Sequence, residues 1–304
     1  MPTGILLIDK PEGFTSFDVI AKMRGISKIR KIGHSGTLDP MATGVLPLLF
    51  EGATKACDIM PNQNKRYTAT LRLGLCTDTQ DITGKVLERH EVTVGRAEVL
   101  NVLPQFSGDI LQLPPMYSAL QIDGKRLYDL AREGKEVARE KRPVTIYSIQ
   151  LLEADDEQHS YTIDVACSKG TYIRTICHDI GAALGCGATL TALRRTEASG
   201  FLLSGCISLA EAQQAAEAGT LYSHFLPVDK AFEGLPRVIL DEYRSRMFQN
   251  GVPLNLTKNE IPLINGSFTV YNEQAAFLGL AHNNYEKNEL CIDKLFALIE
   301  QRGG

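Results

Sequence analysis

The sequence predicts an α+β fold in which helices flank a mixed, mostly antiparallel sheet, with a smaller β-rich part at the C-terminal end. Three observations predict it: strand-like and helix-like segments follow one another irregularly, some strands have hairpin-like neighbours, and no repeat of fixed period is present. A doubly wound α/β fold would instead alternate strands and helices regularly.

The N-terminal segment predicts one strand, one helix and a glycine-rich loop. The apolar run 4–8 ends at an acid, a lysine and Pro11, as a buried strand would. Ser16 can cap a helix that extends to about Arg24, because the apolar positions recur at helical spacing. Glycines then concentrate between residues 33 and 44, where the chain can turn tightly.

The middle of the chain predicts further strands and helices. Strands are expected where apolar and polar residues alternate, and helices where apolar residues recur at helical spacing. The expected strands are 66–75, 85–88, 117–122, 144–152 and 161–168. The expected helices are 94–103, 126–133 and 171–184, and residues 81–84 are expected to form a turn.

A domain boundary is expected just before Gly234, because turn residues cluster at 232–236. A chain of 304 residues is long enough for about two domains. We therefore expect one domain over 1–233 and a small β-rich domain over 234–304, the latter with one helix at 241–250.

The composition is that of an ordinary folded protein, with 44% hydrophobic and 22% charged residues. The seven cysteines are scattered, odd in number and nowhere spaced C-x-x-C, which disfavours a disulfide framework and a zinc ribbon. No apolar run approaches the roughly 18 residues of a membrane span, and the first residues do not resemble an export signal. We expect a cytoplasmic protein.

Charge is distributed unevenly along the chain. The formal net charge of −4 gives by itself no support to a nucleic-acid partner. Basic residues nevertheless cluster without any acid between 20 and 36, and they outnumber acids by seven to five between 115 and 150. Such patches can bind phosphate, although a solvated surface explains them about equally well. The first cluster is Lys22, Arg24, Lys28, Arg30 and Lys31.

Asp39 is the single acid in the glycine-rich loop. Asp-Pro pairs are common in turns, so spacing alone favours a structural carboxylate over a catalytic one. Neither G-x-x-x-x-G-K-[ST] nor G-x-G-x-x-G is present, which leaves nucleotide sites without support. His178 has no second metal ligand one helical turn away. We therefore expect no metal and no cofactor.

The run Gly33–Pro47 resembles the signature loop of the TruB family, the bacterial tRNA pseudouridine-55 synthases related to the catalytic subunit of guide-RNA complexes. Other family motifs follow in order, so the resemblance covers about residues 4–200. They include Asp9-Lys10-Pro11, Lys65-Arg66-Tyr67, Thr77-Asp78-Thr79, Gly124-Lys125-Arg126, Ser168-Lys169-Gly170 and Leu193-Arg194-Arg195. The resemblance implies a pseudouridine-synthase catalytic domain over 1–233 and a small PUA-like domain over 234–304.

The resemblance also implies an active site. Asp39 would be the nucleophile that breaks the N-glycosidic bond of uridine, after which the base turns and rejoins through carbon. Arg174 would pair with Asp39 and keep it charged. Tyr67 would stack on the flipped uracil and help to remove the ring proton. The other residues expected to contact substrate are Tyr172, His34 on the loop that enters the RNA, Leu193 as a wall of the uridine pocket, and Lys10, placed for loop order or backbone contact.

The implied substrate is the T-loop uridine at position 55 of tRNA, bound through the T-arm. An insertion at about 121–142 resembles the segment that folds over this RNA hairpin. The short N-terminus and the lack of a basic tail favour a stand-alone enzyme that needs no guide RNA, and a monomer is the default expectation. A hypothesis from another class is a tRNA-folding factor, or RNA chaperone, in which isomerisation is secondary.

Overall fold

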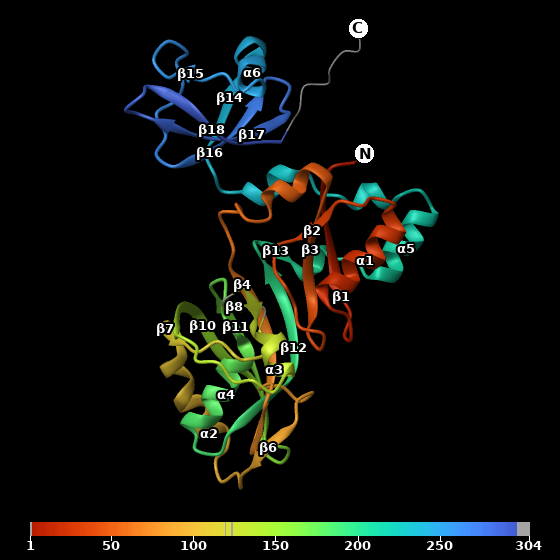
Figure 1. Cartoon of the computed structure of the whole chain (residues 1–304), viewed down its shortest axis with the longest axis vertical. Helices are drawn as coiled ribbons and strands as arrows, with labels where there is room; N and C mark the ends of the chain where they lie inside the picture. Colours follow the sequence, from red (N-terminus) through yellow and green to blue (C-terminus); the bar gives the residue numbers. More distant parts are fainter. Residues whose placement is uncertain (1, 119, 123, 297–304) are drawn as a thin grey trace.

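The computed structural model describes residues 2–118, 120–122 and 124–296. Its main sheet has nine strands and runs through the larger part of the molecule (Figure 1). Every pairing in this sheet is antiparallel except the short parallel contact of β12 with β3, so the predicted mixed, mostly antiparallel sheet is confirmed. The strands in spatial order are β1 (Gly4–Lys10), β3 (Thr43–Phe50), β12 (Ala188–Ala198), β4 (Lys65–Leu73), β11 (Ser160–Cys167), β10 (Arg142–Asp155) and β7 (Gly108–Gln112), with β2 (Ile32–His34) on β3 and β13 (Phe201–Leu202) on β12.

Two groups of helices cover this sheet. Helices α2 (Arg96–Val102) and α4 (Ile173–Ala183) contribute buried residues to the same core cluster as β4, β11 and β12. Helices α1 (Ser16–Ser27) and α5 (Leu209–Glu217) contact each other and share a second core with β1 and β3. No helix in the described part of the chain is long and apolar enough to cross a membrane.

Short elements complete the larger part of the molecule. A hairpin of β5 and β6 continues from β4, and a second small hairpin of β8 and β9 precedes α3. Their bounds are β5 (Leu75–Thr77), β6 (Val86–Arg89), β8 (Gln121–Ile122), β9 (Lys125–Arg126) and α3 (Leu127–Arg132). The 3-10 helices are η1 (Glu51–Ala56), η2 (Leu103–Phe106), η3 (Leu203–Gly205), η4 (Leu221–His224) and η5 (Val228–Phe232).

The start of α1 differs from the prediction in a way that bears on the loop before β3. Thr15, not Ser16, is the N-cap: its hydroxyl accepts the Asp18 N–H at 3.0 Å, and the Asp18 carboxylate accepts the Thr15 N–H at 2.8 Å. Ser16 is instead buried, and its Oγ accepts the backbone N–H of Leu38 at 2.9 Å. The helix start is thereby tied to the glycine-rich loop.

Two central strands, β3 and β12, were not predicted. The run that forms β3 contains Pro47, a residue that normally argues against a central strand. Pro47 lies where β3 changes its partner from β12, at residues 43–44, to β2, at residues 48–50. The alternating pattern of β12 is short and interrupted by charge. Part of the strand expected at 117–122, residue 119, lies outside the described residues, and among the described ones pairing is present only at Gln121 and Ile122.

The C-terminal end forms a separate five-stranded sheet (Figure 1). This sheet fits the predicted small β-rich, PUA-like domain. It contacts the larger part through Phe232, whose ring centroid lies 5.9 Å from that of Phe277 and 5.5 Å from that of Phe296. Its elements are β14 (Arg237–Leu240), α6 (Glu242–Gln249), β15 (Leu254–Asn255), β16 (Ser267–Asn272), β17 (Phe277–Asn284) and β18 (Glu289–Leu295).

Candidate active site

Asp39 lies in the loop between β2 and β3, and the backbone on both sides of it is anchored. On one side, Leu38 is held by its hydrogen bond to Ser16. On the other, the Pro40 carbonyl accepts the Gly13 N–H at 2.8 Å and the Lys10 ammonium at 3.2 Å. The Asp39 side chain keeps 37% of its surface exposed. The loop therefore presents one carboxylate at a defined place on the surface.

Arg174, at the start of α4, binds this carboxylate. Its Nε lies 2.9 Å from Asp39 Oδ2, while its two terminal nitrogens donate to the carbonyls of Thr79, at 3.0 Å, and Tyr117, at 2.8 Å. Asp81, also buried, lies 3.7 Å from the guanidinium. Only 5% of the Arg174 side chain is exposed. A guanidinium fixed on three sides orients the Asp39 carboxylate through a charge-assisted hydrogen bond.

Arg195, on β12, also holds this loop. In the sequence, Arg195 is indicated only as part of a family motif. Its side chain is fully buried and donates to three carbonyls: Val45 at 2.7 Å, Gly36 at 3.1 Å and Thr37 at 3.3 Å. Gly44 lets the backbone of β3 lie against that of β12, because a Cβ at Gly44 would lie 2.1 Å from the Arg195 carbonyl oxygen. Recognition of β12 as a strand would have placed Arg195 on the same face as Leu193.

Replacing Arg195 with methionine is expected to lower the free energy of unfolding by about 3 kcal/mol or more, because two loop carbonyls and the β3 carbonyl of Val45 lose their donor. Arg194→Met is the matched control. Arg194 is 41% exposed and pairs with Asp9 at 2.7 Å, and exposed ion pairs contribute about 1 kcal/mol or less. Urea unfolding of both variants measures the difference. Equal losses would show that the loop does not depend on Arg195.

Tyr67 and Leu193 lie on neighbouring strands, β4 and β12, and both are buried. Tyr67 stands opposite Arg195 in the β4–β12 register. Burial raises the pKa of the Tyr67 phenol, and the charge of Arg195 only partly opposes this. The phenol is therefore protonated at neutral pH in the free protein.

Tyr172 is the N-cap of α4, two residues before Arg174. Gln112 holds its backbone on both sides, accepting the Tyr172 N–H at 2.8 Å and donating to its carbonyl at 3.0 Å. Gln112 is buried at the end of β7, a strand the sequence did not predict, so sequence reasoning missed this contact. Burial also raises the pKa of the Tyr172 phenol. The clamp fixes the start of the helix that carries Arg174.

His34 is the last residue of β2, and its side chain binds the loop that follows. Its Nδ1 accepts the Gly36 N–H at 3.1 Å, which assigns the ring proton to Nε2. Burial and the nearby Arg195 charge lower the pKa of His34, so the ring is neutral at pH 7.

Lys10 is fully buried at the end of β1. Its ammonium donates to the carbonyls of Pro11, Phe14 and Pro40, and burial lowers its pKa to about 8. All of these acceptors belong to the protein. Of the two roles expected for Lys10, the geometry therefore favours ordering the Asp39 loop over contact with a substrate backbone.

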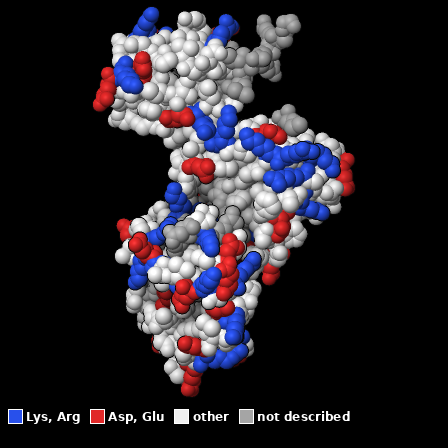
Figure 2. All heavy atoms as spheres, viewed as in Figure 1, with Lys and Arg blue, Asp and Glu red and all other residues white. Residues whose placement is uncertain are grey.

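Basic residues lie on the surface near this loop. The acid-free segment 20–36 exposes Lys22, Arg24, Lys28, Arg30 and Lys31, and Figure 2 shows Lys and Arg gathered over the region of α1. The described part of the insertion instead carries charges of both signs, which form ion pairs such as Lys135–Glu133 at 2.7 Å and Arg139–Glu136 at 3.3 Å. The stronger positive field therefore comes from α1 and the turn after it.

Two family models match consecutive parts of the chain. The model described as TruB family pseudouridylate synthase (N-terminal domain) matches residues 24–173, and the model described as tRNA pseudouridylate synthase B C-terminal domain matches residues 174–233. Among curated proteins, tRNA pseudouridine synthase B of Clostridium tetani is 43% identical over 93% of this chain and 96% of its own length. The protein of the same name from Pseudomonas putida strain F1 is 44% identical over 91% and 90%.

Two solved structures with a similar fold are chains of larger assemblies. A chain in the crystal structure of a Cbf5–Nop10–Gar1 complex superimposes with a TM-score of 0.74 at 25% identity, covering 97% of this chain and 85% of that one. A chain of the archaeal box H/ACA sRNP Nop10–Cbf5 complex has a TM-score of 0.72 at 23% identity, covering 98% and 87%, which shows the shared fold.

Proposed function

Because the chain belongs to the TruB family of pseudouridylate synthases, we propose that it is a tRNA pseudouridine synthase that converts uridine 55 in the T-loop, without a guide RNA. The observation that carries the mechanism is the 2.9 Å contact between the part-exposed Asp39 carboxylate and the buried Arg174 guanidinium. A positioned, ionised carboxylate is what nucleophilic catalysis on a flipped nucleotide requires.

The proposed reaction is an isomerisation, so every atom of the uridine is conserved. The bond between the ribose and the ring nitrogen breaks with Asp39 as nucleophile, and the detached uracil turns. A new bond then forms to a ring carbon, which loses its proton, while the ring nitrogen gains one. No oxidant, phosphoryl donor or cofactor enters this balance.

We assign the remaining residues by their positions. Arg174 orients the nucleophile. Tyr67 and Tyr172 stack on or contact the displaced uridine, with Leu193 as the apolar wall of the pocket. For Tyr67 we favour stacking over proton removal, because burial keeps its phenol protonated and a proton acceptor must first be ionised. His34, neutral and at the end of β2, supports the displaced base, and Lys10 orders the Asp39 loop.

The proposal includes the expected organisation of the chain. We assign residues 1–233 to catalysis, the insertion at about 121–142 to the T-arm, and residues 234–304 to a PUA-like domain with peripheral RNA contact. The exposed basic segment 20–36 is suited to phosphate contact. All seven cysteines are free in the structure, which supports the reducing cytoplasm as the compartment. We propose that the protein acts as a monomer.

The test is to incubate the protein with an unmodified T-arm transcript and no other additive, and to map pseudouridine by mass spectrometry and by reverse transcription after chemical labelling. We expect modification at position 55. A transcript with cytidine at this position is the control and should stay unmodified. If the T-arm is modified only after an RNA fraction is added, the stand-alone assignment is wrong. If another uridine is modified, the position is wrong.

A further inference from the structure

Cys76, Glu88 and His90 lie together on one face of the β5–β6 hairpin. Cys76 on β5 is the cross-strand partner of Glu88 on β6, and His90 follows Glu88 by two residues, which places it on the same face. The His90 N–H donates to the Gly74 carbonyl at 3.0 Å, which fixes the backbone where His90 leaves the strand. The arrangement therefore comes from strand register and not from a chance meeting of surface side chains.

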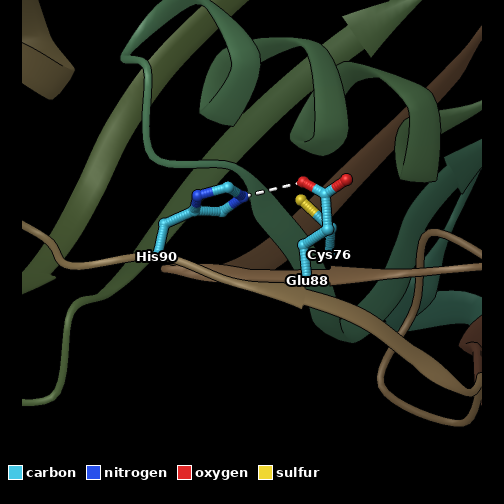
Figure 3. Close-up of side chains that lie close together, drawn as sticks. All are labelled: Cys76, Glu88 and His90. Carbon is cyan, nitrogen blue, oxygen red and sulfur yellow. Dashed lines mark hydrogen bonds and ion pairs between the residues drawn. The ribbon is translucent and has the colours of Figure 1, made fainter.

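The three side chains also converge in space. Figure 3 shows the imidazole, the carboxylate and the thiol directed toward one another, with His90 Nε2 2.9 Å from Glu88 Oε2. One ligand atom from each residue lies within 4.8 Å of the other two. Among the described residues, no other group of three potential metal ligands lies this close together. Sequence spacing alone does not connect Cys76 on β5 with Glu88 on β6 and His90 just after it.

Gly187, in the turn before β12, closes one side of this group. A Cβ at this position would lie 2.4 Å from Cys76 Sγ and 3.4 Å from His90 Cδ2, so the backbone of Gly187 lies directly against both side chains. The opposite side is open, because the Glu88 and His90 side chains are 63% and 40% exposed. An ion could therefore enter from solvent and keep a water ligand.

We propose that Cys76, Glu88 and His90 bind a zinc-class divalent cation, with water completing the coordination. Thiol sulfur and imidazole nitrogen are ligands of zinc and cobalt, whereas magnesium and calcium prefer oxygen alone. Metal–ligand bonds of about 2.0–2.3 Å place the ligand atoms of one tetrahedral ion roughly 3–4 Å apart. The group already lies close to this spacing, and the exposed Glu88 and His90 side chains can move.

Binding has a defined proton balance. The Cys76 thiol loses its proton and binds as thiolate, and Glu88 binds as carboxylate. His90 binds through Nε2, the nitrogen that faces Glu88 in the free protein, so its imidazole takes the tautomer with the proton on Nδ1, and the proton released is that of the thiol. Because the ion displaces the thiol proton, zinc affinity rises as the pH rises. No local spacing indicates this group, because the hairpin register brings its three residues together.

The site has a structural consequence for the proposed active site. The loop that joins β5 to β6 carries Thr79 and Asp81, and both contact Arg174. An ion bridging Cys76 with Glu88 and His90 would clamp the two strands from which this loop extends. The metal is a support for the loop and takes no part in the chemistry at Asp39.

The experiment is a zinc titration of the metal-stripped full chain in competition with a chromogenic chelator. We expect wild type to bind one equivalent, and Cys76→Ser and His90→Gln to bind about 100-fold more weakly. Cobalt substitution should give a thiolate-to-metal charge-transfer band in wild type that is lost in Cys76→Ser. Circular dichroism verifies that the variants are folded.

The C-terminal sheet offers a matched control with the same types of residue across a hairpin. His282 stands opposite Cys291 and pairs with Asp293 at 2.6 Å, yet this trio is outside the group whose ligand atoms converge. Cys291→Ser should leave zinc affinity within about twofold, since it removes a thiol but no ligand. The proposal is overturned if wild type takes up no zinc, if Cys76→Ser binds like wild type, or if Cys291→Ser loses as much affinity.

Discussion

Asp39→Asn is expected to abolish pseudouridine formation, with a loss on the order of 10⁴-fold or more, and to leave tRNA affinity within about threefold. The amide has nearly the same shape as the carboxylate, and its oxygen can still accept from Arg174 Nε, so the anchored loop keeps its conformation. A neutral amide is not a competent nucleophile, so the covalent step fails while RNA contacts stay intact.

The measurement pairs quantitative pseudouridine mapping with equilibrium binding of fluorescent T-arm RNA. Asp39→Ala belongs beside it, because deamidation of the introduced amide would regenerate the carboxylate and restore activity, whereas alanine cannot revert in this way. Asp58→Asn, at an exposed carboxylate after η1, is the control and should turn over like wild type. Turnover by Asp39→Ala at more than a few per cent of wild type would contradict the nucleophile assignment.

The same variant separates the enzyme from the RNA-folding factor. A strain carrying Asp39→Asn retains any ability to open and refold tRNA but makes no pseudouridine. If the Asp39→Asn strain grows like wild type while a deletion strain is impaired, refolding of tRNA is the more important activity. If both strains are impaired alike, isomerisation is the more important activity.

Arg174→Lys is expected to lower kcat by about 10²–10³-fold and to change tRNA affinity little. Arginine uses three nitrogens here, one for Asp39 and two for the carbonyls of Thr79 and Tyr117. A lysine ammonium is a single point charge and cannot hold all three acceptors in the plane of a guanidinium. The carboxylate would then lose its fixed orientation although a positive charge remains.

Single-turnover and binding measurements distinguish this effect from weaker RNA contact. Arg66→Lys is the matched control, because the half-exposed Arg66 also binds a carboxylate, that of the buried Asp164 at 2.9 Å, but does not contact Asp39. Its turnover should stay within about threefold of wild type. If Arg174→Lys lowers affinity and leaves the single-turnover rate unchanged, Arg174 acts in RNA binding and does not orient the nucleophile.

Local sequence patterns predicted several elements of the main sheet and of the helices that pack on it. The predicted strands at 66–75 and 161–168 and the helix at 171–184 differ from β4, β11 and α4 by no more than two residues at each end. Alternation and helical spacing are properties of short segments, so they indicate a strand or a helix independently of its tertiary partners. Pattern failed for β3 and β12, because Pro47 and the adjacent arginines are acceptable there only through particular strand partners.

The sequence by itself determined the fold class and, through the resemblance of the run 33–47, the family. It also named Asp39 and Arg174, although they are far apart along the chain. Only the tertiary structure decided what holds them: Arg195 beneath the loop, Gln112 behind Tyr172, and Lys10 turned inward to backbone carbonyls. It likewise brought Cys76 to Glu88 and His90. Such contacts depend on strand register and on burial, which bring together residues that no local pattern connects.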